Sequence, residues 1–232
     1  MPEIYLLSAG AAQAVADALA PQFRTATQVE VRASFQPVGA LEEKFLAGEP
    51  CDVIVSTAAM LEQFSNAMRV DAATIAPLGR VHTGIAVRLG ERTPAIGDRG
   101  ELRAALEQAA RVYVPDPGRA TAGIHFVKVL HELGLYEALA PRLAAYPNGA
   151  AAMAALAAAT ERDCIGCTQI TEIKYTRGVT LVGALPSEFD LATLYAAAVS
   201  RSAREPELAL RFVRMLAGTE SERLRREAGF EA

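Results

Sequence analysis

The chain has 232 residues, of which 51% are hydrophobic and 22% are charged, and its formal net charge is −4 at pH 7. This length and composition predict one large or two small domains around a substantial apolar core. No run of Lys and Arg forms a basic stripe, so nucleic acid is not an expected partner, and the most apolar stretch, residues 150–159, is too short to insert into a membrane.

The first segment has the pattern of a strand followed by a helix. Residues 4–7 are an apolar run, residues 8–10 are small, and apolar residues recur every four positions between 11 and 24. The first-turn N–H groups of a helix have no intrahelical partner and lie at the positive end of its dipole. We therefore expect the loop after this strand to hold an anion. The alternative is a plain connection, the role of most such units in α/β proteins.

Two more units of the same kind follow. Residues 29–35 alternate like a strand and lead through a loop at 36–39 to a second helix. Residues 52–56 form a third strand, and Thr57 is the expected N-cap of a helix over 58–69. Successive units of this type predict a parallel sheet flanked by helices, with ligands at the carboxyl ends of its strands.

The pattern then changes to two long extended runs. Residues 81–89 have no helical period and are interpreted as a crossover into a second lobe, and residues 191–199 as the return crossover. We therefore expect lobe I to contain residues 1–80 and 188–232, and lobe II to contain residues 81–187.

Lobe II and the end of the chain contain further strand and helix patterns. We expect strands at 112–114, 164–168 and 178–183, and helices at 101–110, 122–133, 135–139, 150–159, 206–216 and 220–227. Thr121 is the expected N-cap of helix 122–133, on which Ile124 is expected on the buried face and His125 in solvent.

The cysteines and histidines predict no metal site, redox site or cofactor. Cys164 and Cys167 are spaced as C-x-x-C, but in a strand side chains three apart point to opposite faces. With Cys51 as the third cysteine, there is no second pair to complete a zinc site or a disulfide framework. The three histidines are scattered along the chain.

Four segments together resemble the molybdate-binding proteins of ABC importers. They are SAGA at 8–11, LEEKFLAGEPCDVIVS at 41–56, VPDPGRATAGIHFVKVLHEL at 114–133 and REAGF at 226–230. The resemblance covers nearly the whole chain and implies an α/β fold of the type II periplasmic binding protein kind. Such a fold has two lobes, each a mostly parallel sheet flanked by helices, with two crossovers forming a hinge. It also implies a small anionic ligand between the lobes, such as molybdate, tungstate or an organic acid, and delivery to an ABC permease.

The resemblance implies binding by hydroxyl and backbone N–H groups, but this chain lacks the hydroxyls. The family's serine positions fall on Ala11 and on residues 37–39, and its tyrosine position falls on Cys167. Each missing charge-assisted hydrogen bond costs about 1.5–3 kcal/mol, so we expect an organic acid to bind better than molybdate. The expected ligand-binding residues are Ser8, Ala9, Gly10, Ala11, Gln36, Val38, Gly39, Thr57, Thr121, Ala122, Asn148, Gly149, Cys167, Thr168 and Gln169.

The same scaffold resembles aconitate isomerases, which move a double bond in a tricarboxylic acid by a proton shift. This chemistry needs a base and cations near the ligand. Arg80, Arg119, His125 and Lys174 are available, but none lies in a specific motif, so no catalytic residue is assigned and binding is favoured over catalysis.

The start of the sequence bears on where the protein acts. Its first residues lead directly into the first strand, without the basic and apolar regions of a signal peptide. We therefore expect a periplasmic protein if a signal peptide has been removed and a cytoplasmic one otherwise. We also expect a monomer.

Overall fold

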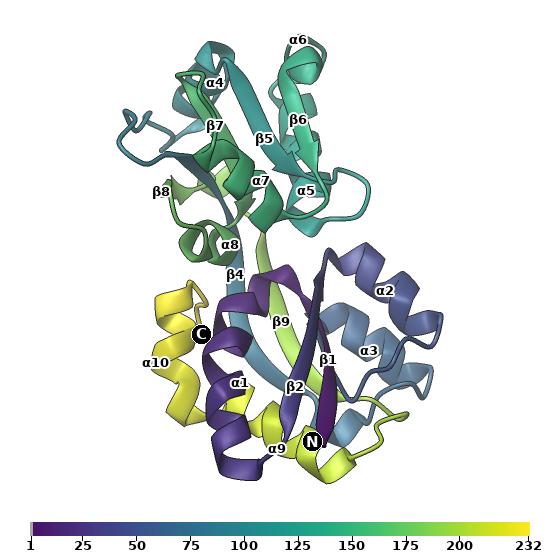
Figure 1. Cartoon of the computed structure of the whole chain (residues 1–232). Coiled ribbons are helices and arrows are strands. Elements are labelled where there is room, and N and C mark those ends of the chain that lie inside the picture. The colour runs from purple at the N-terminus through teal and green to yellow at the C-terminus, as the bar shows by residue number, and fades with distance from the viewer. Residues whose placement is uncertain (1) are drawn as a thin grey trace. The chain divides into compact units, whose positions relative to one another are not determined.

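The computed structural model describes residues 2–232, which divide into two compact units (Figure 1). Unit 1 comprises the chain up to Val81 together with Thr193–Ala232, and unit 2 comprises His82–Ala192. From the sequence we expected these boundaries at 80/81 and 187/188. Within the described residues, no helix combines the length and apolar character needed to cross a membrane.

Unit 1 is a sheet covered by helices. Its elements are β1 (Glu3–Ala9), η1 (Gly10–Ala12), α1 (Gln13–Thr27), β2 (Glu30–Gln36), α2 (Val38–Leu46), β3 (Val53–Thr57), α3 (Ala58–Asn66), η2 (Ala72–Thr74), most of β9 (Ala192–Val199), α9 (Pro206–Ala217), η5 (Thr219–Ser221) and α10 (Glu222–Ala228). The strands run in the order β2-β1-β3-β9, with β1 parallel to β2 and β3 and with β9 antiparallel to β3. Helices α1 and α10 lie on one side of the sheet, and α2 and α3 lie on the other (Figure 1).

The core of unit 1 follows from the apolar periods of its elements. Val15, Leu19 and Phe23 recur every four residues on α1, and all three are buried. The Phe23 ring packs edge-on against the Phe212 ring of α9, with centroids 5.1 Å apart. This contact joins an early helix to one near the end of the chain.

Unit 2 is a second α/β unit. Its elements are the later part of β4 (Ala76–Arg88), α4 (Arg99–Gln108), β5 (Arg111–Pro115), α5 (Thr121–Glu132), α6 (Tyr136–Leu139), η3 (Ala140–Arg142), β6 (Leu143–Tyr146), α7 (Gly149–Ala157), β7 (Cys164–Gln169), α8 (Ile170–Tyr175), β8 (Val179–Ala184) and η4 (Ser187–Phe189). Strand β5 is parallel to β6 and β7, whereas β4 is antiparallel to β7 and β8. Helix α5 contributes Phe126, Val129 and Leu130 to one apolar cluster, and α7 contributes Met153 and Leu156 to another.

The expected α/β fold with mostly parallel sheets is confirmed, and each sheet also contains antiparallel strands. Strand β9 in unit 1 and strands β4 and β8 in unit 2 run antiparallel to their neighbours. The expected β-α units account for the parallel strands. The two extended crossovers are themselves strands, β4 and β9.

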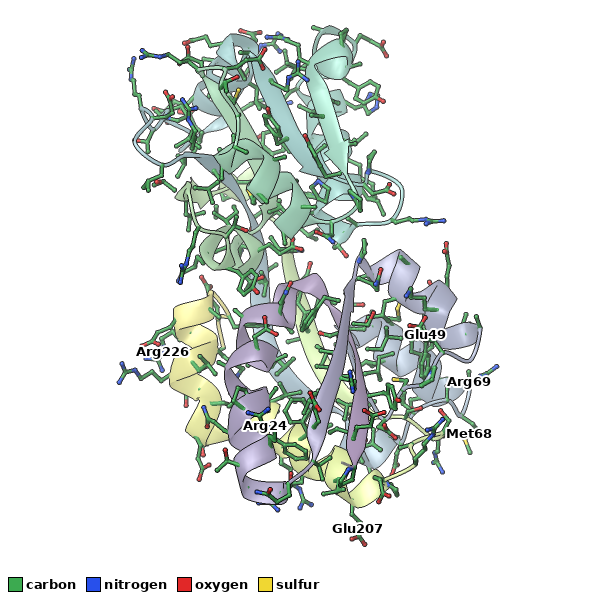
Figure 2. All side chains as sticks on the ribbon, in the orientation of Figure 1. Arg24, Glu49, Met68, Arg69, Glu207 and Arg226 are labelled. Carbon is green, nitrogen blue, oxygen red and sulfur yellow. The ribbon has the colours of Figure 1, made fainter. Side chains whose placement is uncertain are left out.

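Several expected boundaries were wrong. Helix α3 ends at Asn66, and Met68 lies beyond it with φ 57°, 67% exposed and pointing away from unit 1 (Figure 2). Residues 36–39 are not a continuous loop, because β2 extends to Gln36 and α2 begins at Val38. Ile124 was expected on the buried face of α5 but is 37% exposed. That face is formed instead by residues that include Gly123 and Phe126. Strand β6 and helix α8 were not expected at all.

Candidate functional site

The carboxyl ends of β1, β2 and β3 meet at one edge of the unit 1 sheet. The register pairs Ala9 with Gln36 and Ser8 with Val55. Residues 8–11, residues 36–39 and Thr57 therefore lie close together, as expected for the ends of parallel strands.

The helices at this edge begin in two different ways. Thr57 caps α3, because its Oγ1 accepts the N–H of Met60 at 3.3 Å, which confirms the expected cap. In contrast, α1 and α2 begin after Ala12 and Pro37, and neither of these N-cap residues brings a side-chain cap. The Gln13 N–H at the start of α1 donates to the Gly10 carbonyl, so the first-turn N–H groups of α2 are the donors that this edge offers.

The side chains expected to help at this edge are partly engaged elsewhere. Ser8 is fully buried, and its hydroxyl donates to the carbonyl of Ala9 at 2.9 Å. The Gln36 amide donates to the Ser34 hydroxyl at 3.2 Å. Ala11 is buried and brings no polar side chain. Unit 1 thus offers mainly backbone donors.

A corresponding edge in unit 2 is formed by the ends of β5 and β7. Helix α5 begins just after β5, and its Gly123 lies so close to the chain that an added Cβ would be 2.5 Å from the carbonyl oxygens of Pro115 and Asp116. Thr121 is the first residue of α5 and not its N-cap, which is Ala120 without a side-chain cap. The N–H groups at Thr121 and Ala122 therefore belong to a third uncapped first turn.

The first-turn N–H groups of α7, unlike those of α5, have side-chain acceptors. Asn148 is its N-cap and accepts the N–H of Ala151 at 2.8 Å. The carboxylate of Glu172, on α8, receives hydrogen bonds from the N–H groups of Gly149, Ala150 and Gln169. The Thr168 hydroxyl donates to Glu172 Oε2 at 2.5 Å. An internal carboxylate therefore occupies the N-terminus of α7.

The electrostatics of Glu172 are set by two opposing effects. The residue is only 7% exposed, and burial raises the pKa of its carboxyl above the ordinary value. The hydrogen bonds from Thr168 and from the three backbone N–H groups lower that pKa in part, because they favour the charged form. No charged side chain is among the groups that shift it.

Sequence reasoning missed Glu172, although a local signal for it exists. Gln169 is the N-cap of α8, and Glu172 is the third helical residue, which is the position of the acid in a capping box. The acid of a capping box accepts the N–H of the N-cap residue, which accounts for the hydrogen bond from the Gln169 N–H to the Glu172 carboxylate. The bonds to Gly149 and Ala150 come from a segment 22 to 23 residues earlier in the chain and have no sequence signature.

Two other expectations need correction. Cys167 is fully buried in the apolar cluster that also contains Phe126, so its thiol does not replace the hydroxyl of the family's tyrosine. Cys164 lies in the other cluster, with Met153, so the two cysteines point to opposite faces of β7. His125 is half-buried instead of solvent-facing, and its Nε2 lies 2.7 Å from the carbonyl oxygen of Phe189.

A separate cavity of about 520 Å³ lies within unit 2 near α4. Its wall includes Val87, Ala105 and Ile165, and none of the expected ligand-binding residues lines it. The described residues contain no group of three His, Cys, Asp or Glu side chains arranged to hold a metal ion.

Comparisons with known proteins agree with this architecture. The model of the family described as bacterial extracellular solute-binding protein matches residues 4–231. An aconitate isomerase from Pseudomonas sp is 25% identical over 235 residues, covering 97% of this chain and 86% of that protein. The periplasmic molybdate-binding protein of Azotobacter vinelandii has a TM-score of 0.80 at 19% identity, covering 99% of both chains. The sulfate-binding protein of Mycobacterium tuberculosis has a TM-score of 0.76 at 16% identity, covering 99% of this chain and 86% of that one. These likenesses establish the two-lobed fold of type II periplasmic binding proteins.

Proposed function

Because this chain belongs to the family of bacterial extracellular solute-binding proteins, we propose that it binds a small organic acid through backbone N–H groups at the starts of its helices. The observation that carries the proposal is that α2 and α5 begin at the expected binding positions Val38 and Thr121, and that their N-cap residues bring no side-chain cap. Such first turns favour anions without requiring a basic side chain.

The choice of an organic acid over a compact oxyanion rests on the missing hydroxyls. Ala11, Val38 and Gly39 have none, and the Cys167 thiol is buried in the apolar core. The start of α7 already holds the Glu172 carboxylate. A tetrahedral dianion needs short donors on all sides, whereas a carboxylate needs them on one side only.

Titration calorimetry and thermal shift measurements test this proposal. The ligands are molybdate, tungstate, sulfate, citrate, malate and both aconitate isomers. A ligand that binds only the folded state stabilises it by about 2.7 kcal/mol at one hundred times its dissociation constant. We expect such an effect from at least one organic acid, and a weak effect or none from molybdate. Submicromolar binding of molybdate, without heat from any organic acid, would overturn the proposal.

We further propose that the protein acts outside the cytoplasm as a monomer and delivers its ligand to an ABC permease. Family membership supports an extracellular role, and the likeness to binding proteins of importers supports the permease. Sedimentation velocity tests the monomer, and uptake by cells carrying the cognate permease tests delivery.

A second candidate function is isomerisation of an unsaturated tricarboxylic acid. One observation favours it, namely the Pseudomonas aconitate isomerase that is similar over nearly the whole chain. Incubation of the protein with each aconitate isomer, followed by chromatography, decides between the two. Multiple turnovers per protein molecule identify an enzyme, and binding without conversion identifies a solute-binding protein.

A further inference from the structure

Buried polar groups without partners are concentrated in unit 2. Among the described residues, five buried side-chain polar atoms have no hydrogen-bond partner, and four of them lie in this unit. They are the hydroxyls of Thr83 and Thr171 and both the Nε2 and Oε1 atoms of Gln169. An unpaired buried polar group is destabilising, and native proteins keep few of them. Such a cluster therefore indicates a missing partner.

Two of these residues, Thr83 and Gln169, lie near each other at the end of β7. Thr83 and Gln169 are directly opposite in the antiparallel pair formed by β4 and β7. Directly opposed residues point to the same face of a sheet, with Cβ atoms about 4.5–5.5 Å apart. Thr171 follows two residues later, in the first turn of α8. Thr83 and Thr171 are fully buried, and Gln169 is 3% exposed.

The neighbouring Glu172 limits which groups of Gln169 can meet the missing partner. Its carboxyl group already uses the backbone N–H of Gln169 as well as those of Gly149 and Ala150. Only the side chain of Gln169 is left to meet a ligand.

We propose that the Gln169 carboxamide, with the Thr83 hydroxyl opposite it, recognises the hydroxyl group of a hydroxycarboxylic acid. This inference rests on the proposed binding of an organic acid and names the class of that acid.

The chemistry of the three groups fits a hydroxyl better than an oxyanion. A carboxamide offers donors at Nε2 and acceptor sites at Oε1, and each threonine hydroxyl both donates and accepts. A ligand hydroxyl also donates and accepts, so it satisfies both ends of the amide. An ionised oxyanion accepts only, so the Oε1 atom would stay unpaired.

Matched ligand pairs test the inference directly. Citrate and tricarballylate differ only by a hydroxyl, and so do malate and succinate. A buried site that hydrogen-bonds a ligand hydroxyl rejects the analogue without it strongly. For the unmodified protein we expect the hydroxy acid of at least one pair to bind no less than tenfold more tightly than its partner by titration calorimetry.

Gln169→Met and Thr83→Val probe the protein side, because both keep the size of the side chain and remove its polar group. We expect the affinity ratio between the hydroxy acid and its analogue to fall at least tenfold in each variant. We also expect neither variant to melt at a lower temperature than the original protein, because the substitution removes an unpaired polar group. Gln63→Met, at an exposed position of α3, is the matched control and should change neither.

The outcomes separate this inference from the proposed function. If no organic acid binds the unmodified protein, the proposed function fails. If organic acids bind but the pairs bind equally, or the variants keep the preference, the inference alone fails. Lower melting of both variants with unchanged affinity would assign the polar cluster to an ordered buried water, which also overturns the inference.

Discussion

Asp52 and Arg204 are 152 positions apart in the sequence, yet the Asp52 Oδ1 atom accepts the backbone N–H of Arg204 at 2.6 Å. The other carboxylate oxygen accepts the N–H of Tyr5 at 2.7 Å. Asp52 is 2% exposed, so one buried carboxylate joins the start of β1, the approach to β3 and the chain beyond β9.

Replacing Asp52 should therefore destabilise unit 1. Asp52→Ala leaves two N–H groups without an acceptor, and each unsatisfied buried group costs about 1–3 kcal/mol. We expect the free energy of unfolding to fall by about 2–5 kcal/mol in urea titrations followed by circular dichroism. Glu49→Gln removes a half-exposed carboxylate paired with Lys44 and should cost less than about 1 kcal/mol. Equal losses for both variants would contradict the assigned role of Asp52.

The absence of a side chain at Gly149 leaves room for the Glu172 carboxylate at the N-terminus of α7. A Cβ at this position would lie 1.9 Å from Glu172 Oε2 and 2.1 Å from Thr168 Oγ1, so Gly149→Ala must displace both side chains. We expect a loss of about 1–3 kcal/mol from overpacking. Alanine is otherwise the better helix former by about 1 kcal/mol, so the sign of the effect is informative.

Two variants sharpen this test. Gly100→Ala on α4 is the control, because its Cβ would meet only the Asp98 side chain, at 3.3 Å, and we expect little change. The Glu172→Ala substitution removes the obstructing side chain and should relieve the clash. Gly149→Ala should therefore lower the free energy of unfolding by less in the Glu172→Ala background than in the original protein. Strictly additive effects would show that the two residues do not interfere.

The three cysteines should be unreactive in the folded protein. Burial raises the pKa of the Cys51 thiol to about 12 and the pKa of the Cys167 thiol well above its usual range. Burial also raises the pKa of Cys164. The thiolate is the reactive form, so we expect a thiol reagent at about pH 8 to label none of them before unfolding.

Unfolding without a reductant should then expose all three thiols to the reagent, because the structure contains them as free cysteines. A Met68→Cys variant places a thiol at a position that is 67% exposed and should react at once in the folded state. Fewer than three thiols in the unfolded original protein would reveal a disulfide.

The sequence predicted the elements with strong periods and missed those with weak ones. The apolar face of α1 and the Thr57 cap were predicted because each depends on residues close together in the chain. Strand β6 is four residues long and contains no fully buried residue, and α8 has only six residues, so neither presents a full period.

The meeting of the strand ends, on which the candidate site depends, was predicted for the same physical reason. Strand ends can be located from local patterns, and those of β1 and β2 do meet, as the pairing of Ala9 with Gln36 shows. What fills a helix N-terminus depends on contacts between distant segments. The approach of Glu172 to Gly149 is of this kind, as is the burial of Cys167 against Phe126.

The buried carboxyl of Glu172 should make stability depend on pH. Burial raises its pKa in the folded protein above the unfolded value of about 4.3, so the folded state binds the proton more readily. The contribution of this group is therefore fully present below the unfolded pKa and is lost as the pH rises through the folded pKa. The Glu172→Gln variant has no titrating group at this position. We expect the stability of the original protein relative to this variant to fall as the pH rises from the unfolded pKa through the raised folded pKa.

Urea titrations of both proteins at several pH values measure this difference. Glu137→Gln replaces an exposed carboxylate on α6 and controls for the substitution itself. Because the carboxylate accepts bonds from the Thr168 hydroxyl and from backbone N–H groups, a second outcome is informative. If the original protein gains stability relative to Glu172→Gln as the pH rises, these bonds outweigh the cost of burial. The pKa of Glu172 would then lie below its unfolded value, and the prediction would be wrong.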